Sequence, residues 1–235
     1  MTDERQQAQI DPLPESPLEG PRPGPSRGSI AVLVVVVVAL SLIRMPFILY
    51  GPGMQDEQWF AGPGWTAAWE GVPRLPYVPT QDPESVFYRA DHVFYAVMPA
   101  FLYAQVPFHW FLDWGYTSSR LPSWIAGIAS LLILFAILRR LGVNDLIAIG
   151  AVAVCGMSRG FFFAWLNTRP DMLCSLFGLS AVYCGLRFLD VPTRRLAAIV
   201  GLFVGLALLS HPFAIVFVIQ VTGIVLLCRT LPWRQ

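Results

Sequence analysis

The fold is decided by residues 30–50, IAVLVVVVVALSLIRMPFILY, an apolar run whose only charge is Arg44. The hydrocarbon core of a bilayer takes about 20 apolar residues per helix, so this run predicts a transmembrane helix. The acidic pair Asp56-Glu57 follows a few residues beyond its end. Carboxylates are costly to hold at a membrane boundary and more often mark a functional site than an accident of composition. Asp56 and Glu57 are therefore the first candidate site residues.

The composition indicates an integral membrane protein with several spans. Hydrophobic residues make up 55% of the 235 residues and charged residues only 13%, too few to cover a soluble surface. The fold class we expect is all-α, a polytopic transmembrane helical bundle. The net charge is +1 and the chain has no Lys, so no basic patch predicts a nucleic-acid partner. Membrane lipid is the expected partner.

The cysteines and histidines do not suggest a ligand set. Four cysteines lie inside apolar runs without CxxC spacing, which is typical of small packing residues: Cys155, Cys174, Cys184 and Cys228. The three histidines are scattered, and no close acidic cluster accompanies them. We therefore predict no metal site, no disulfide framework and no cofactor.

The two ends of the chain differ from the apolar middle. Residues 1–29 contain six prolines among polar residues, and they cannot bury enough apolar surface to offset the entropy of ordering. We expect a disordered cytoplasmic tail, followed by an uncleaved signal anchor at residues 30–50, because that run is longer than the core of a usual signal peptide. Residues 229–235 are expected to form a short cytoplasmic end.

Arginine placement sets the predicted topology, because cytoplasmic loops carry an excess of basic residues. Residues 93–111 are apolar, but Pro99 and Pro107 interrupt them, so we expect an interfacial, juxtamembrane helix inside one long outer loop, 51–120. The later arginine clusters then fall on the side of the N-terminal tail, and both termini are cytoplasmic. The transmembrane domain, 30–228, is expected to have six spans: 30–50, 121–138, 146–165, 172–189, 196–210 and 213–228.

Ionisable groups from distant parts of the chain share the predicted outer face. Besides Asp56 and Glu57 they are Arg89, Asp91, His92, Arg120, Arg169, Asp171 and His211. Arg44, and more weakly Arg159, lie in the outer halves of outward-running spans and can snorkel toward the same face. Ordinary structural roles stay open for all of them, as loop charges, interface anchors, tight turns or helix caps.

This set of side chains suits a lipid-linked phosphate. Arg binds phosphate through paired donors, and a carboxylate can deprotonate an attacking hydroxyl. A sugar donor on a polyprenyl carrier fits, since its phosphate leaves as an anion that needs stabilisation. Aromatic residues of the long loop could stack on sugar rings or simply anchor the chain at the membrane interface: Trp59, Trp65, Trp69, Tyr77, Tyr88 and Trp110.

The order and spacing of these groups resemble a known class of enzymes. The segments that carry the resemblance are Arg44, Asp56-Glu57, Asp91-His92, Arg120-Leu121-Pro122-Ser123, Arg139-Arg140-Leu141-Gly142 and Arg169-Pro170-Asp171. Together they are similar to the polytopic GT-C glycosyltransferases, in the branch of the protein O-mannosyltransferases and aminoarabinose transferases. The resemblance covers roughly residues 44–211.

The resemblance implies a function and a role for several residues. It implies transfer of a sugar from a polyprenyl-phosphate donor to an extracytoplasmic acceptor, which is a lipid, glycan or protein. Asp56 would be the catalytic carboxylate, assisted by Glu57 and covered by juxtamembrane helices, with Arg120 and Arg169 near the carrier phosphate. Asp171 matches a recurring acidic residue of the class.

The resemblance also leaves a non-catalytic alternative open. Enzymes of this class usually continue through further spans, so we expect the sequence to be a fragment, a split gene product or a minimal module. The alternative is a truncated transferase remnant, or a small membrane protein that binds or transports polyprenyl lipids.

Overall fold

A computed structural model describes residues 24–54, 56–78, 82–94, 96–112 and 114–230, with side chains as far as Leu226. Within these ranges every regular element is helical, which confirms the predicted all-α class. The prediction of a disordered tail lies outside the described residues up to position 23. The described chain is already helical from Arg27, so the first helix begins slightly earlier than the sequence predicted.

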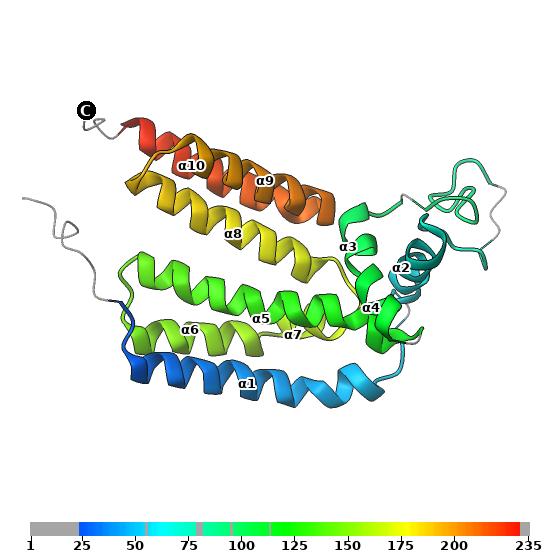
Figure 1. The fold of residues 1–235 in the computed structure, drawn as a ribbon, viewed down its shortest axis with the longest axis horizontal. Coiled ribbons are helices and arrows are strands. Elements are labelled where there is room, and N and C mark those ends of the chain that lie inside the picture. Colours follow the sequence, from blue (N-terminus) through cyan, green and yellow to red (C-terminus); the bar gives the residue numbers. More distant parts are fainter. Residues whose placement is uncertain (1–23, 55, 79–81, 95, 113, 231–235) are drawn as a thin grey trace, which may run out of the picture.

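The long helices run side by side along one direction, and α2, α3 and α4 gather at one end of the bundle (Figure 1). The bundle helices are α1 (Arg27–Tyr50), α5 (Tyr116–Arg140), α6 (Asp145–Met157), α8 (Asp171–Asp190), α9 (Arg194–Ser210) and α10 (Ile215–Thr230). The end helices are α2 (Gln58–Glu70), α3 (Pro99–Ala104) and α4 (Val106–Phe111). We call this region the α2–α4 end. The start of α1 and the end of α10 lie at the opposite end (Figure 1).

Side-chain caps begin three of the bundle helices at that opposite end. The side chains of Ser26, Asn144 and Thr193 accept hydrogen bonds from backbone N–H groups of the first turns of α1, α6 and α9, at 3.0, 2.9 and 3.2 Å. Such caps satisfy donors that have no partner inside the helix. Ion pairs between Arg139 and Asp145 and between Arg140 and Asp190 join neighbouring helices there.

The core of the bundle lies where α1, α5, α6, α7 (Arg159–Leu166) and α8 meet. Trp165 is fully buried, and its indole N–H donates to the backbone oxygen of Trp124 at 2.7 Å. α5 passes close to this ring because position 127 is glycine: a Cβ there would lie 2.3 Å from the ring of Trp165. Close helix approach at a small residue is the usual way in which membrane helices pack.

The number of helices able to cross a membrane is lower than the predicted six. Among the described residues three helices are long and apolar enough, α1, α5 and α8, or four if the bent pair α6 and α7 is counted as one span. α9 and α10 have 17 and 16 residues. At 1.5 Å per residue, helices of this length reach about 25 Å, short of a hydrocarbon core of about 30 Å. The prediction of six full spans is therefore wrong by this criterion.

The predicted span at 146–165 is not one straight helix, because the helix breaks at Ser158. α6 and α7 meet there at an angle of 63°. Ser158 is extended, and its hydroxyl donates to the backbone oxygen of Cys155 at 2.7 Å. Arg44 of α1 donates to the backbone oxygen of Gly156, which the break has released from the helix. A broken helix is tolerated in a membrane where neighbouring groups satisfy such freed backbone atoms.

The described residues of 93–111 contain no helix long enough to span a membrane, as expected, but they contain two short helices instead of one. α3 and α4 have six residues each, and a proline stands in the first turn of both. Proline suits the first turn but cannot continue a helix through its interior. Before them, residues 73–78 and 82–94 have a small core of their own, where Leu75, Ala90 and Phe94 are buried.

Candidate active site

The acidic pair divides into one buried and one exposed carboxylate. Glu57 stands at the start of α2 and is fully buried. Arg120, in the first turns of α5, donates to both of its carboxylate oxygens, from Nε at 2.8 Å and from Nη2 at 2.6 Å. Backbone N–H groups of Met54 and Thr168 donate to the same carboxylate at 2.9 and 2.7 Å. Glu57 thus joins the α1–α2 segment, α5 and the turn before α8.

Arg120 also caps the C-terminal end of α1. Its Nη1 donates to the backbone oxygens of Phe47, Ile48 and Gly51 at 3.0, 3.3 and 3.0 Å, and its Nη2 to that of Pro52 at 3.0 Å. The last carbonyls of a helix lack partners within the helix and carry its negative dipole end, so a guanidinium suits this place. All three of its nitrogens are engaged with the protein.

The surroundings of Glu57 keep it ionised. Burial alone would raise the pKa of this carboxyl, because it disfavours the charged form. The hydrogen bonds from Arg120, Met54 and Thr168, together with the positive charge of Arg120, outweigh burial and hold the pKa below its usual value. A carboxylate whose oxygens are filled by donors in this way is a poor acceptor for a further proton.

The exposed carboxylate, Asp56, belongs to a second group of charges. Arg169 Nη1 donates to Asp56 at 2.9 Å, and Arg169 Nε donates to Asp171 at 2.9 Å. One guanidinium therefore bridges two carboxylates that come from the first loop and from the first turn of α8. The Asp56 side chain is 60% exposed and that of Arg169 25%. This pair lies at the surface, above the buried pair of Glu57 and Arg120.

A pocket of about 350 Å³ opens beside this charged group. Its lining residues come from the first loop and from the segment around the end of α7: Met54, Asp56, Glu57, Phe163, Asn167 and Arg169. The Asn167 amide is held by a hydrogen bond to the backbone oxygen of Phe163 at 2.7 Å, and the guanidinium of Arg169 lies over the Phe163 ring at 5.6 Å. We call this the Asp56 pocket.

Three of the pocket residues were missed by the sequence reasoning. Asn167 precedes Thr168-Arg169-Pro170-Asp171, and a polar residue next to that turn is the one available signal. Nothing in the sequence marks Met54 and Phe163 as pocket residues, because apolar residues at the ends of membrane helices are common.

The structure brings together five of the predicted site residues and places the others elsewhere. Asp56, Arg169 and Asp171 form the exposed group, and Glu57 lies in the pocket lining with Arg120 behind it. Arg44 does not snorkel to this group. It is buried between α1, α6 and α7, with its guanidinium 4.6 Å from the Phe162 ring centre and 4.3 Å from that of Trp165.

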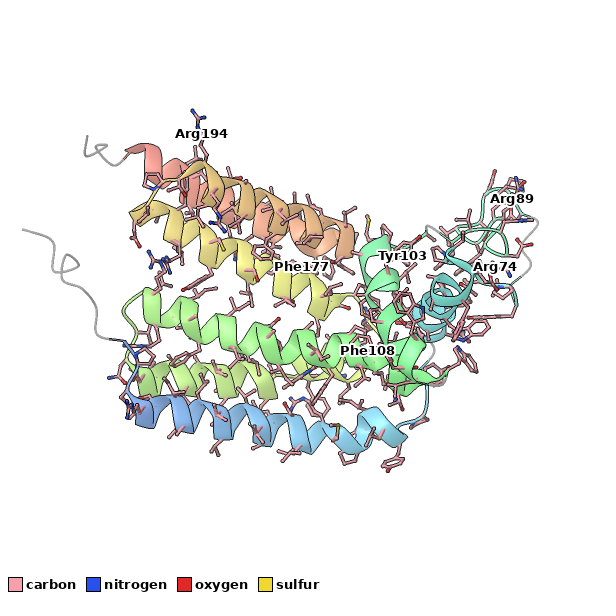
Figure 2. The ribbon with its side chains drawn as sticks, in the orientation of Figure 1. Arg74, Arg89, Tyr103, Phe108, Phe177 and Arg194 are labelled. Carbon is pink, nitrogen blue, oxygen red and sulfur yellow. The ribbon has the colours of Figure 1, made fainter. Side chains whose placement is uncertain are left out.

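Arg89, Asp91 and His92 lie in the loop beyond α2 and do not line the Asp56 pocket. Figure 2 shows Arg89 at the outer edge of the molecule, on the same side as Arg74 and far from Arg194 at the opposite end of the bundle. Asp91 and His92 approach each other at 3.6 Å, and both side chains are at least 40% exposed. Their substrate-binding roles stay predictions.

His211 forms a local turn between α9 and the short helix η1 (Pro212–Ala214). Its Nδ1 accepts a hydrogen bond from the backbone N–H of Phe213 at 3.1 Å, and its ring packs on the Phe213 ring. Like the charged group it stands at the α2–α4 end, where α9 ends (Figure 1). Among the described residues, no group of three or more His, Cys, Asp or Glu side chains is arranged to hold a metal ion.

The fold and the pocket define a class of protein: a helical membrane bundle with a carboxylate–guanidinium site at one end. The comparison with known families makes the assignment narrower. The family described as dolichyl-phosphate-mannose-protein mannosyltransferase matches residues 92–234, more than half of the chain. The chain belongs to this family, which confirms the resemblance to the GT-C glycosyltransferases.

The extent of the match bears on the site. It begins at His92 and includes Arg120, Arg169, Asp171 and His211, whereas Asp56 and Glu57 precede it. The acidic pair therefore lies outside the matched region in sequence, but it contacts that region through Arg120 and Arg169. No curated protein sequence and no solved structure matches the chain.

Proposed function

We propose that this protein transfers a sugar from a polyprenyl-phosphate donor to an extracytoplasmic acceptor, with Asp56 as the general base. Membership of a mannosyltransferase family supports the reaction class and makes mannose the first donor sugar to test. The α2–α4 end, which carries the site, would then face the extracytoplasmic side, and both termini would be cytoplasmic.

The observation that carries this proposal is the different engagement of the two neighbouring carboxylates. Glu57 is buried and filled by four donors, whereas Asp56 is exposed at the pocket and holds one hydrogen bond, from Arg169. A general base must reach the proton that it removes, and it must have a free oxygen lone pair to accept it. Asp56 meets both conditions, and Glu57 meets neither.

The reaction we propose is a single displacement at the anomeric carbon. Asp56 accepts the proton of the acceptor hydroxyl as that oxygen forms a bond to C1 of the sugar. The bond between C1 and the phosphate oxygen breaks, and the polyprenyl phosphate leaves with the electron pair. The sugar is inverted at C1, because the acceptor and the leaving group occupy opposite faces.

Arg169 is the residue that we assign to the departing phosphate. Two of its nitrogens are engaged by Asp56 and Asp171, and the structure gives its Nη2 no partner among the described residues. A guanidinium donor aimed at the leaving oxygens stabilises the charge that develops on them. Arg120 has no nitrogen to spare for this role, so we propose that it positions the site and does not bind the donor phosphate.

The test is transfer by protein reconstituted in liposomes with radiolabelled polyprenyl-phosphate mannose and a panel of glycan, lipid and peptide acceptors. Asp56→Asn should lower turnover by about 100-fold or more, the usual effect of losing a general base. Asp82→Asn is the matched control, because Asp82 is an exposed loop carboxylate outside the pocket whose cap on Glu84 an amide oxygen can replace. Equal turnover by Asp56→Asn and wild type would overturn the assignment of Asp56. No turnover by the wild type with any acceptor would favour the non-catalytic alternative.

A further inference from the structure

The turn between α7 and α8 contributes two polar side chains to the Asp56 pocket. Arg169 is assigned above to the donor phosphate, but Asn167, two residues before it, has no part in the proposed reaction. Asn167 follows the last residue of α7 and is 4% exposed. A side chain that is nearly buried and still lines a pocket meets a ligand only through the atoms that face the pocket. Those atoms decide what Asn167 can bind.

A hydrogen bond to α7 fixes the orientation of the Asn167 amide. Its Nδ2 donates to the backbone oxygen of Phe163 at 2.7 Å. This oxygen belongs to the last turn of α7, where carbonyls lack partners within the helix. A carbonyl oxygen only accepts hydrogen bonds, so the amide atom beside it is the nitrogen and not the oxygen. The Asn167 amide therefore caps α7 with its nitrogen and leaves Oδ1 for another contact.

Asn167 Oδ1 is an accessible acceptor without a partner. No described residue donates a hydrogen bond to it, and it is not one of the enclosed polar atoms that lack a partner. The neighbouring Thr168 shows the contrast, because its Oγ1 is enclosed and out of reach of a ligand. Oδ1 therefore keeps accessible surface, in a nearly buried residue that lines the Asp56 pocket. The pocket thus offers a ligand one neutral acceptor at a fixed place.

The other carboxylate and apolar groups of the lining do not compete for this role. Glu57 is filled by four donors, and Asp56 is the proposed base for the acceptor hydroxyl. Met54 and Phe163 contribute apolar side chains. Among the described residues of the lining, Asn167 Oδ1 is the side-chain acceptor that remains. An amide oxygen accepts a hydrogen bond but is too weak a base to remove the proton, so it suits a hydroxyl that is bound and does not react.

The acceptor of Asn167 and the guanidinium of Arg169 are held together by one residue. The Phe163 carbonyl accepts from Asn167, and the Phe163 ring lies under the Arg169 guanidinium at 5.6 Å. In a polyprenyl-phosphate sugar the ring hydroxyls stand close to the phosphate on C1, so one turn of the chain can contact both parts of the donor. The pocket volume of about 350 Å³ is near the lower end of the range for small-molecule sites and suits a single sugar.

The geometry points to Asn167 as a specificity residue, whose Oδ1 accepts a hydrogen bond from a ring hydroxyl of the sugar that is transferred. The inference rests on the proposed function for the identity of the ligand. A donor that lacks this hydroxyl would leave Oδ1 without a partner in a closed site, which weakens binding. A residue that only caps α7 needs Nδ2 alone, and its loss would not distinguish one sugar from another.

The experiment measures binding without transfer, with no acceptor present and with the protein in lauryldimethylamine oxide, so that no detergent sugar competes. The probes are polyprenyl-phosphate mannose and polyprenyl phosphate, each displacing radiolabelled polyprenyl-phosphate mannose. Asn167→Leu should weaken binding of the mannose lipid about three- to tenfold, as expected for one neutral hydrogen bond. Binding of polyprenyl phosphate should stay within about twofold of wild type, because its phosphate is held by Arg169. Equal changes for the two lipids in a folded Asn167→Leu variant would overturn the inference.

The wild-type protein gives a second measurement that does not depend on the folding of a variant. Four analogues of the mannose lipid each lack one ring hydroxyl or the 6-hydroxyl. At least one of the ring analogues should bind wild type about three- to tenfold more weakly than the mannose lipid does. The same analogue should bind Asn167→Leu as tightly as the mannose lipid does, and it identifies the hydroxyl that Asn167 binds. Four analogues that bind wild type as tightly as mannose would contradict the role of Asn167.

The other asparagine of the chain is the matched control. Asn144 caps α6 at the opposite end of the bundle, so Asn144→Leu should lower the melting temperature and leave both lipid affinities unchanged. A loss of mannose preference in Asn144→Leu as large as in Asn167→Leu would show that the effect comes from stability, and it would overturn the inference. A wild type that binds neither lipid would overturn the proposed function as well. A wild type that binds both lipids equally but transfers mannose would overturn the inference alone.

Discussion

At the scale of single residues, Asp56 and Glu57 show how neighbours in sequence can have opposite environments. α2 begins at Gln58, directly after the pair, and the side chain of Glu57 is buried whereas that of Asp56 is 60% exposed at the pocket. The buried carboxylate of Glu57 stabilises the fold through Arg120, and the exposed carboxylate of Asp56 is free to accept a proton. Substitutions of the two should therefore separate stability from activity.

Glu57→Gln is expected to destabilise the protein strongly. It leaves the guanidinium of Arg120 buried without its counter-charge, and breaking a buried pair from one side costs about 3–5 kcal/mol. Thermal unfolding in detergent, followed by fluorescence, measures the change in melting temperature. Asp56→Asn is the control, since the Asp56 side chain is 60% exposed and its pair with Arg169 is open to solvent on that side. A melting temperature unchanged by Glu57→Gln would contradict the structural role of the pair.

The lowered pKa of Glu57 predicts that the stability of the folded protein depends on pH. The pKa of Glu57 is lower in the folded protein than in the unfolded chain, where it is about 4.3. The unfolded chain therefore binds more protons between the two values, and the stabilisation is present above the unfolded pKa and lost as the pH falls through the folded one. Melting temperatures from pH 7 to pH 3 should fall more steeply for the wild type than for Glu57→Gln. Parallel curves would show that Glu57 gains no proton in this range.

Arg44 is a buried charge that donates to backbone oxygens and does not contact the Asp56 pocket. Arg44→Met should lower the free energy of unfolding by about 1–3 kcal/mol, because the Gly156 carbonyl at the helix break loses its donor. Turnover per folded molecule should stay near that of the wild type. Arg159→Met is the control, since Arg159 lies at the same break but is exposed. Loss of turnover in folded Arg44→Met would instead place Arg44 in the site.

At the scale of elements, helix packing depends on a few small residues. Gly127→Ala would place a methyl group 2.3 Å from the Trp165 ring and force α5 away from α7, at a cost of about 1–3 kcal/mol. Gly201→Ala, in α9, meets no atom within 4 Å and should be neutral or slightly stabilising through helix propensity. The two variants are compared by melting temperature. Equal values would contradict the close contact of α5 with Trp165.

The elements also show what the sequence reveals and what it hides. The helices α1, α5 and α8 were predictable because each is a long apolar run. The break at Ser158 was not predictable, because no proline marks it. The Gly156 carbonyl that the break frees accepts a hydrogen bond from Arg44, which lies on a helix far away in sequence. The division of 93–111 into α3 and α4 depends on Pro107, which was seen as an interruption but not as the start of a second helix.

The site was predictable only as a set of charges at one end of the bundle. Arginines and carboxylates near helix ends are visible in the sequence, and Asp56, Arg169 and Asp171 do meet. Which residues pair is decided by the turn before α8, whose Thr168 N–H reaches Glu57 and whose Arg169 reaches Asp56.

At the scale of the whole molecule, the bundle predicts which segments share a side of the membrane. Figure 1 places the turn between α9 and α10 at the α2–α4 end and the turn between α8 and α9 at the opposite end. In a variant without the native cysteines, Val86→Cys and Phe213→Cys should react with an impermeant maleimide from one side of the membrane, and Val191→Cys from the other. These three positions are all exposed. Labelling of residues 86 and 213 from opposite sides would contradict the arrangement of α8, α9 and α10.

The most direct test of the account compares Asp56→Asn with Glu57→Gln in one preparation, by melting temperature and by mannosyl transfer per folded molecule. We predict that Asp56→Asn melts like the wild type and loses transfer about 100-fold or more, as expected for a missing general base. Glu57→Gln should melt at a lower temperature, and its folded fraction should keep most of its transfer activity. The opposite result, an active Asp56→Asn beside a stable and inactive Glu57→Gln, would contradict the division between a structural and a catalytic carboxylate.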